Sequence, residues 1–163
     1  MPITTRVIAA QGDGKGMPFF EEALAAVAST IKPGHLVVRA ATGEVDKHVT
    51  AGGTAQAWVA DTNLMIATDT DTVYTAGDTV RYGVYSTGQK VFVRVAAAAA
   101  AIVIGDRLQS AGDGTVQVFV PQVVDEGGVA MVTIQPNNLV GFAVEAIDNS
   151  GGASEVFVEM RVA

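Results

Sequence analysis

The stretch that decides the fold is Ile104-Gly105-Asp106-Arg107-Leu108, which returns nine residues after its glycine through Gly114-Thr115-Val116. Two related stretches come earlier in the chain: Pro33-Gly34-His35-Leu36-Val37-Val38 with Gly43-Glu44-Val45, and Ala76-Gly77-Asp78-Thr79-Val80 with Gly88-Gln89-Lys90-Val91. Glycine adopts the positive-φ conformations of tight turns, so each copy predicts a hairpin of two strands. Units this short cannot bury a face alone and must pack against one another.

The rest of the chain continues this pattern and predicts an all-β fold, a mainly antiparallel β-barrel or sandwich built of hairpins. We expect an N-terminal arm over residues 1–32, a β-rich domain over residues 33–163, and at most one or two short helices. The expected strands are 36–39, 45–49, 56–60, 79–85, 90–95, 107–110, 115–120, 129–135, 140–146 and 155–161. Residues 96–101 are six alanines, and their place between two hairpins predicts a connector with at most a turn or two of helix.

The first 32 residues carry no glycine hairpin. Residues 11–16 are rich in glycine and predict an extended or mobile arm. After Pro18, the helical spacing of Phe20, Leu24, Val27 and Ile31 predicts a short helix that ends before Pro33. The alternative is an irregular arm draped over a neighbouring molecule, because a lone helix of about three turns gains little without tertiary packing.

Composition narrows the range of functions. Of 163 residues, 49% are hydrophobic and only 17% charged, which predicts that some apolar surface is buried between subunits. The net charge of −7 argues against nucleic-acid binding, and the absence of cysteine excludes disulfides and thiolate metal sites. The longest apolar run, 95–104, is shorter than the ~17 residues that span a bilayer, and 7–10 is too short for the core of a secretory signal. We therefore expect no membrane segment and no export.

Motifs that suggest catalysis or metal binding are weak. The glycine-rich stretch 12–16 lacks the order of a phosphate-binding loop. Asp69 and Asp71 have the spacing of a calcium loop, but Val73 stands where a third ligand belongs. Ser150 lies in a glycine-rich stretch typical of either a turn or a serine nucleophile, which needs His35 or His48 as its base; neither has a convincing setting. Those two histidines also lack the spacing of a zinc helix. We predict no enzyme activity, no cofactor and no metal.

Aromatic residues leave two alternatives open. Trp58, Tyr74, Tyr82 and Tyr85 are suited to stacking on sugar rings, which favours a carbohydrate-binding or adhesion module. Aromatic side chains on strands more often pack into cores or interfaces.

Four segments together resemble a known family: Ile31-Lys32-Pro33-Gly34-His35-Leu36-Val37, Ala76-Gly77-Asp78, Ala101-Ile102-Val103-Ile104-Gly105-Asp106-Arg107-Leu108 and Leu139-Val140-Gly141-Phe142-Ala143-Val144-Glu145-Ala146. Their order, a Gly-Asp turn that opens a strand, a Gly-x-Val return and a late Val-Gly-x-Ala-x-Glu-Ala, is similar to that of tailed-bacteriophage head decoration proteins, also called capsid cement proteins. The similarity spans roughly residues 31–162, and each of its elements is degenerate.

The resemblance implies a β domain that assembles, commonly as a homotrimer, on the outer surface of the phage head. There it would bridge major capsid subunits and stabilise the expanded head, without catalysis. The protein would be made in the host cytoplasm and end in the virion. In the alternative, the carbohydrate-binding or adhesion module would belong to a phage tail or surface fibre. The family pattern carries no residue-level binding site, so position alone suggests the contacts with the capsid or between subunits: Phe19, Phe20, Leu24 and Trp58.

Overall fold

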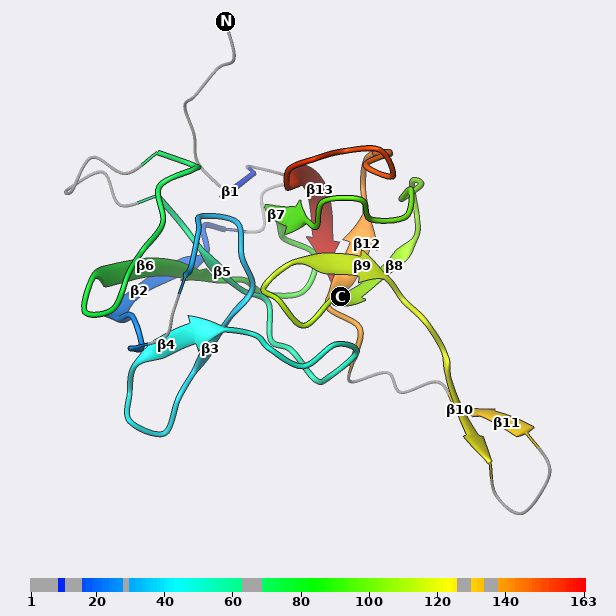
Figure 1. Cartoon of the computed structure of the whole chain (residues 1–163), viewed down its shortest axis with the longest axis horizontal. Helices are drawn as coiled ribbons and strands as arrows, with labels where there is room; N and C mark the ends of the chain where they lie inside the picture. Colours follow the sequence, from blue (N-terminus) through cyan, green and yellow to red (C-terminus); the bar gives the residue numbers. More distant parts are fainter. Residues whose placement is uncertain (1–8, 11–15, 28–29, 63–68, 126–129, 134–137) are drawn as a thin grey trace, which may run out of the picture.

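A closed barrel forms one half of the molecule (Figure 1). The structure is a computed structural model that describes residues 9–10, 16–27, 30–62, 69–125, 130–133 and 138–163. Antiparallel pairing runs in the order β7 (Lys90–Val95), β13 (Val156–Val162), β12 (Gly141–Ala143), β8 (Arg107–Ser110) and β9 (Val116–Val118). A parallel pairing of Val95 with Val116 joins β9 back to β7 and closes the sheet. The short strand β1 (Ala9–Ala10) pairs with the start of β7.

Side chains that face inward, in alternation along each strand, fill this barrel. Val91, Val93 and Val95 of β7 are fully buried, as are Val158 and Met160 of β13 and Leu108 of β8. Successive residues of a strand face opposite sides, so the intervening residues of these strands lie on the outside of the barrel. The described residues contain no helix, and the predicted all-β fold is confirmed.

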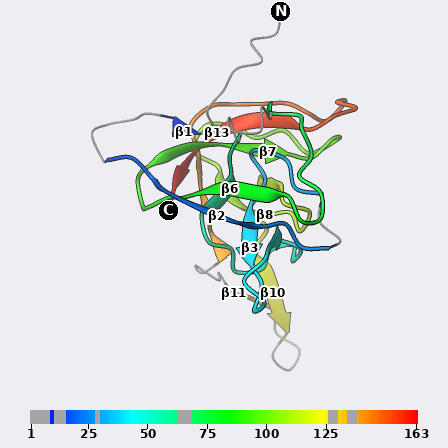
Figure 2. The same ribbon diagram turned by 90° about the vertical axis from the view of Figure 1, so that its left-hand side faces the viewer.

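A second sheet and a hairpin form the other half, which faces the viewer in Figure 2. The sheet has the order β2 (Phe19–Leu24), β6 (Thr79–Val84) and β5 (Trp58–Ala60), and the hairpin pairs β3 (Val37–Arg39) with β4 (Val45–Lys47). Their apolar side chains form a core separate from that of the barrel: Ala25, Ile31, Val37, Val45, Ala60, Tyr74, Val80 and Tyr82.

One kind of turn opens each copy of the repeat. Gly34, Gly77 and Gly105 have φ of +91°, +83° and +90°. The residue after each glycine closes the turn, because its side chain accepts a hydrogen bond from the backbone N–H three residues earlier: His35 Nδ1 from Lys32 at 3.0 Å, Asp78 Oδ2 from Thr75 at 2.7 Å, and Asp106 Oδ2 from Val103 at 2.9 Å. This pattern is typical of a type II turn, and we call it the turn clamp.

The two strands of the second repeat do not pair with each other. The first and third copies form the hairpins β3–β4 and β8–β9. The prediction that 79–85 and 90–95 form a hairpin is wrong, because β6 pairs with β2 and β5 whereas β7 pairs within the barrel. The turn at Gly88, with φ of +85°, instead carries the chain from one sheet to the other.

The helix predicted from Phe20 to Ile31 is also wrong. Phe19–Leu24 is the strand β2, which pairs antiparallel with β6 from Phe19↔Val84 to Leu24↔Thr79. The gain from pairing with a neighbouring strand outweighs a helical period that had no partner to pack on. Residues 28–29 lie outside the described part.

Two further segments differ from expectation or refine it. A hairpin of β10 (Gln122–Asp125) and β11 (Ala130–Thr133) projects from the body (Figure 1), and its first strand was not predicted. Residues 96–101 form a connector without helix, in which Ala98 has a φ of +54°.

Candidate functional site

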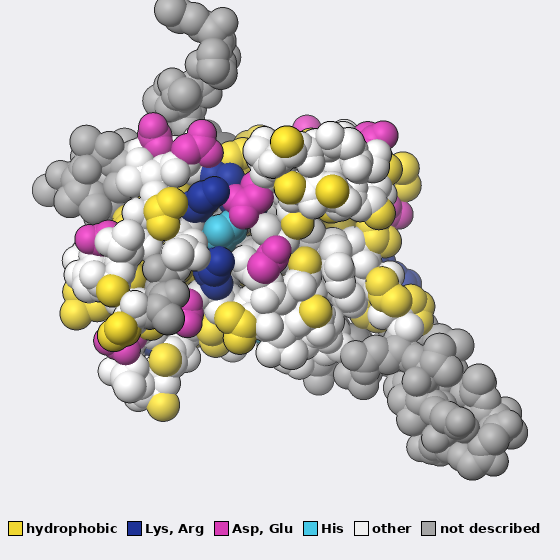
Figure 3. Space-filling model, viewed as in Figure 1, with side chains coloured by type: hydrophobic (Ala, Val, Ile, Leu, Met, Phe, Trp, Pro, Cys, Tyr) yellow, Lys and Arg dark blue, Asp and Glu magenta, His cyan; other side chains and the backbone are white. Residues whose placement is uncertain are grey.

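Charged side chains gather between the two halves, at the middle of the face shown in Figure 3. Arg94 is 2% exposed, and its guanidinium donates to the Pro33 carbonyl at 2.7 Å, to Glu155 at 3.0 Å and to Asp71 at 3.2 Å. It also donates to the Thr70 carbonyl. The same guanidinium carbon lies 4.6 Å from the centre of the Phe157 ring. Arg94 therefore fastens two loops onto the outside of the barrel.

His35 completes this cluster, which we call the interdomain latch: Lys32, His35, Asp71, Arg94 and Glu155. Because His35 Nδ1 accepts from a backbone N–H, the neutral ring carries its proton on Nε2, which donates to Glu155 at 3.3 Å. Burial lowers the pKa of His35 to about 4, against the raising effect of Glu155. Burial raises the pKa of Glu155, but His35, Lys32 and Arg94 outweigh it and the net shift is downward.

His48 is held in a different network. Its Nδ1 lies 2.7 Å from Ser110 Oγ, and its Nε2 lies 3.0 Å from the Thr54 carbonyl. A carbonyl only accepts, so Nε2 carries the proton and the Ser110 hydroxyl donates to Nδ1. This is the order of a serine, a base and an orienting group, yet Ser110 is fully buried and His48 nearly so. The pair ties the loop after β4 to the barrel.

The weak catalytic and metal-binding motifs of the sequence have structural roles wherever they lie among the described residues. Ser150 donates to Asp148 at 2.6 Å in a turn, whereas the side chains of His35 and His48 bond to other residues. Asp69 accepts from Thr72, and Asp71 pairs with Arg94. The stretch 12–15 lies outside the described residues. Among the described residues, no group of three or more His, Cys, Asp or Glu could hold a metal ion, and no helix there is long and apolar enough to cross a membrane.

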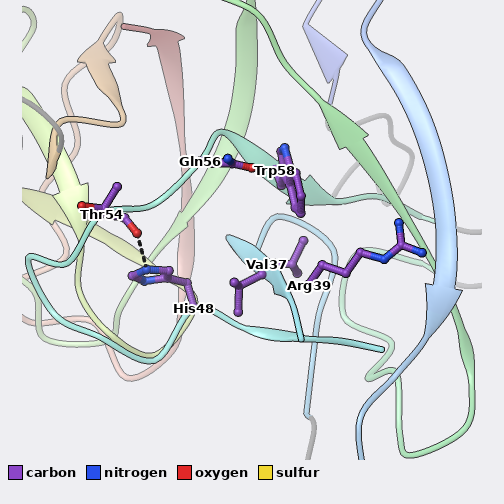
Figure 4. Close-up of a pocket in the computed structure, with 7 residues that line it drawn as sticks. Val37, Arg39, His48, Thr54, Gln56 and Trp58 are labelled. Carbon is purple, nitrogen blue, oxygen red and sulfur yellow. Dashed lines mark hydrogen bonds between the residues drawn. The ribbon is translucent and has the colours of Figure 1, made fainter. Parts of the chain in front are cut away.

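Trp58 lines a groove of about 290 Å³ between β3 and β5 (Figure 4). The groove combines this half-buried indole with polar side chains and the valines of strand β3; its lining residues are Val37, Val38, Arg39, His48, Thr54, Gln56 and Trp58. The Trp58 ring leans on Tyr82, with ring centres 5.8 Å apart. A flat aromatic surface beside amide and guanidinium donors is suited to binding a sugar ring.

The three tyrosines are buried and cannot form part of such a platform. Tyr74, Tyr82 and Tyr85 are between 0% and 6% exposed and belong to the two cores. Tyr82 donates to Glu21 at 2.6 Å, and burial together with that carboxylate raises its pKa to about 12. Of the four aromatic residues proposed for sugar stacking, Trp58 is the one placed for it.

The other three expected contact residues lie on the edge strand β2. Phe19 and Leu24 are 78% and 53% exposed. Phe20 is partly buried, with the Arg81 guanidinium 4.1 Å from its ring centre. Phe19 and Trp58 are both paired with Val84, so these two aromatics lie in one cross-strand row. The helical period in the sequence concealed this arrangement.

The interdomain latch was missed by the sequence reasoning. In 90–95 Arg94 alternates with three valines, which places it outside the barrel, where an arginine is ordinarily solvated. The loops that cover it come from distant parts of the chain. A glycine that needs room beside Arg94, at Gly34, was the available signal.

Comparison with known proteins identifies a fold and no family. No protein-family model and no curated protein matches the chain. Among solved structures, the chain is similar to the N base of the head fiber gp8.5 in bacteriophage phi29, with a TM-score of 0.50 and 16% sequence identity over 89% of this chain and 95% of that chain. At this identity the likeness shows that the two share a fold.

Proposed function

We propose that this protein is a structural component of a phage head, which binds the outer surface of the capsid as an oligomer, bridges neighbouring major capsid subunits and stabilises the expanded head. The observation that carries the proposal is the fold shared with the base of a phage head fiber over nearly the whole of both chains. The order of glycine hairpins that resembles capsid decoration proteins supports it independently.

The described surface is suited to binding other proteins. Phe19 and Leu24 expose apolar side chains on β2, and Ile104 and Phe142 expose theirs at a second place, on the barrel. Several weak contacts made at once give strong retention when the geometry of the partner matches, as on a repeating capsid lattice. Both histidines hold neighbouring segments together, which supports a role without catalysis.

Binding to purified heads tests this proposal. The protein should co-sediment with expanded, undecorated heads of the encoding phage at micromolar concentration and reach a fixed ratio to the major capsid protein. Heads already decorated serve as the control and should take up none. A protein that stays in the supernatant with every head preparation would contradict the proposal.

The groove at Trp58 favours a second function, adhesion to carbohydrate. In a virion protein such a site would contact glycans of the host surface. Trp58→Ala should abolish binding on a glycan array, whereas Trp58→Phe should retain part of it because the aromatic plane remains. Equal binding by wild type and Trp58→Ala, or no binding by the wild type, would remove this candidate.

A further inference from the structure

A row of cationic and aromatic side chains crosses the outside of the barrel. The pairing register places Phe142 of β12 opposite Arg107 of β8 and opposite Arg161 of β13. Paired residues lie on the same face of a sheet, and their neighbours Leu108, Ala143 and Met160 are buried inside. Three strands therefore present Arg107, Phe142 and Arg161 together to the surface.

An apolar groove adjoins this row. Its volume is about 420 Å³, and it is lined by Ile104, Gly105, Phe142, Ala143, Val144 and Arg161. Ile104 is 70% exposed and Phe142 is 37% exposed. We call Ile104, Arg107, Phe142, Val144 and Arg161 the barrel patch.

The two arginines of the barrel patch have no ion pair with any described residue. In contrast, Lys32, Arg39, Lys90 and Arg94 are each paired with a carboxylate. Lys47 and Arg81 also have no ion pair with a described residue, but Arg107 and Arg161 lie in one row with Phe142, beside an exposed apolar groove. Such a groove fits a protruding apolar side chain that is accompanied by carboxylates.

The edge strand β2 carries that combination. Leu24 is 53% exposed, and Glu22, two residues earlier, lies on the same face of the strand. Glu21 already pairs with Arg39 at 3.6 Å, whereas Glu22 has no ion pair with a described residue. β2 lies at the opposite end of the molecule from β8 and β12 (Figure 1).

We propose that β2 of one copy docks on the barrel patch of the next copy, with Leu24 in the groove and Glu22, on the same face of the strand, facing Arg107 and Arg161. The inference rests on the proposed function in one respect: it identifies the contact between subunits of the proposed oligomer. Two β2 strands are poorly suited to pairing with each other, because an antiparallel pair would set Glu21 and Glu22 against their counterparts. A contact between two different surfaces is head-to-tail, and it forms a closed ring when the rotation between copies closes.

A charge exchange tests this contact, with the mass in solution measured by analytical ultracentrifugation of the full chain. The wild type should sediment as an oligomer at micromolar concentration. The double variant Arg107→Glu, Arg161→Glu should associate at least tenfold more weakly, and so should Glu22→Arg. Combining all three substitutions in one chain should restore association, because the charges are then exchanged. Leu24→Ala should weaken it with no change in charge.

The control variant Ala41→Glu, Ala153→Glu adds two negative charges at exposed positions outside both surfaces and should leave association unchanged. Thermal unfolding of each variant shows that loss of association is not loss of fold. An oligomer that survives both charge reversals, or a wild type that is monomeric, would overturn the proposed contact. Head binding by the same wild-type sample then judges the proposed function separately.

Discussion

At the scale of single residues, Gly34 combines two constraints, a positive φ and a lack of room for a side chain. Its φ of +91° favours glycine, and a Cβ there would clash with Phe157 Cε1 and lie 3.1 Å from Arg94 Cγ. Gly105 has a nearly identical φ of +90°, but a Cβ there would have nothing within 4 Å. The two positions separate the cost of backbone conformation from the cost of crowding the interdomain latch.

Gly34→Ala should therefore destabilise the protein more than Gly105→Ala. Backbone strain alone should cost about 1–2 kcal/mol at Gly105. At Gly34 the same strain is joined by a clash with a packed ring, which adds about 1–3 kcal/mol. Urea unfolding of both variants measures the difference. Equal free energies of unfolding would contradict the close approach of Gly34 to Phe157.

At the scale of elements, the sequence predicted strands well and their partners poorly. The strand 107–110 matches β8 at both ends, because a glycine turn and a polar clamp residue define its start. The period of 20–31 predicted a helix, since a residue pattern alone carries no information about the neighbouring strand β6. Barrel closure and the row Arg107–Phe142–Arg161 depend on register between distant strands, which no local pattern encodes.

The projecting hairpin β10–β11 should be dispensable for folding. In the described residues its two strands pair with each other and with no other strand. Replacing residues 122–133 with a short Gly/Ser linker should change the free energy of unfolding by less than about 1 kcal/mol, because loop length has a small effect on stability.

The same replacement of residues 37–47 is the matched control for this prediction. It removes Val37 and Val45 from the second core and should unfold that half of the molecule. A loss of several kcal/mol on removal of the β10–β11 hairpin would show that this hairpin packs against the body.

At the scale of the whole molecule, the interdomain latch makes the contact between the two halves sensitive to acid. His35 is neutral and buried in the folded protein, with a pKa lowered to about 4, and recovers its ordinary value of 6.5 on unfolding. Between these values the unfolded chain binds more protons than the folded one, so stability falls as pH falls. The lowered pKa of Glu155 adds a loss in the same direction at still lower pH.

The free energy of unfolding should fall by about 2 kcal/mol between pH 7 and pH 5 in the wild type. His35→Asn keeps an acceptor for the Lys32 N–H without a titrating ring, and should lose much less over that range. Urea unfolding at several pH values measures both proteins. Parallel pH profiles of the wild type and the variant would show that His35 does not control the acid response.

The position of β13 in the barrel also determines when the fold can be completed during synthesis. β7 and β12 have no direct pairing with each other in the described residues, and the strand between them is made of residues 156–162. A ribosome releases the chain from its N-terminus, so the β2–β6–β5 sheet is available to fold before β13 emerges. Until β13 is made the barrel stays incomplete, and Val91, Val93 and Val95 are not yet covered by β13. Translation that stalls before residue 156 would therefore leave an aggregation-prone chain for chaperones to hold.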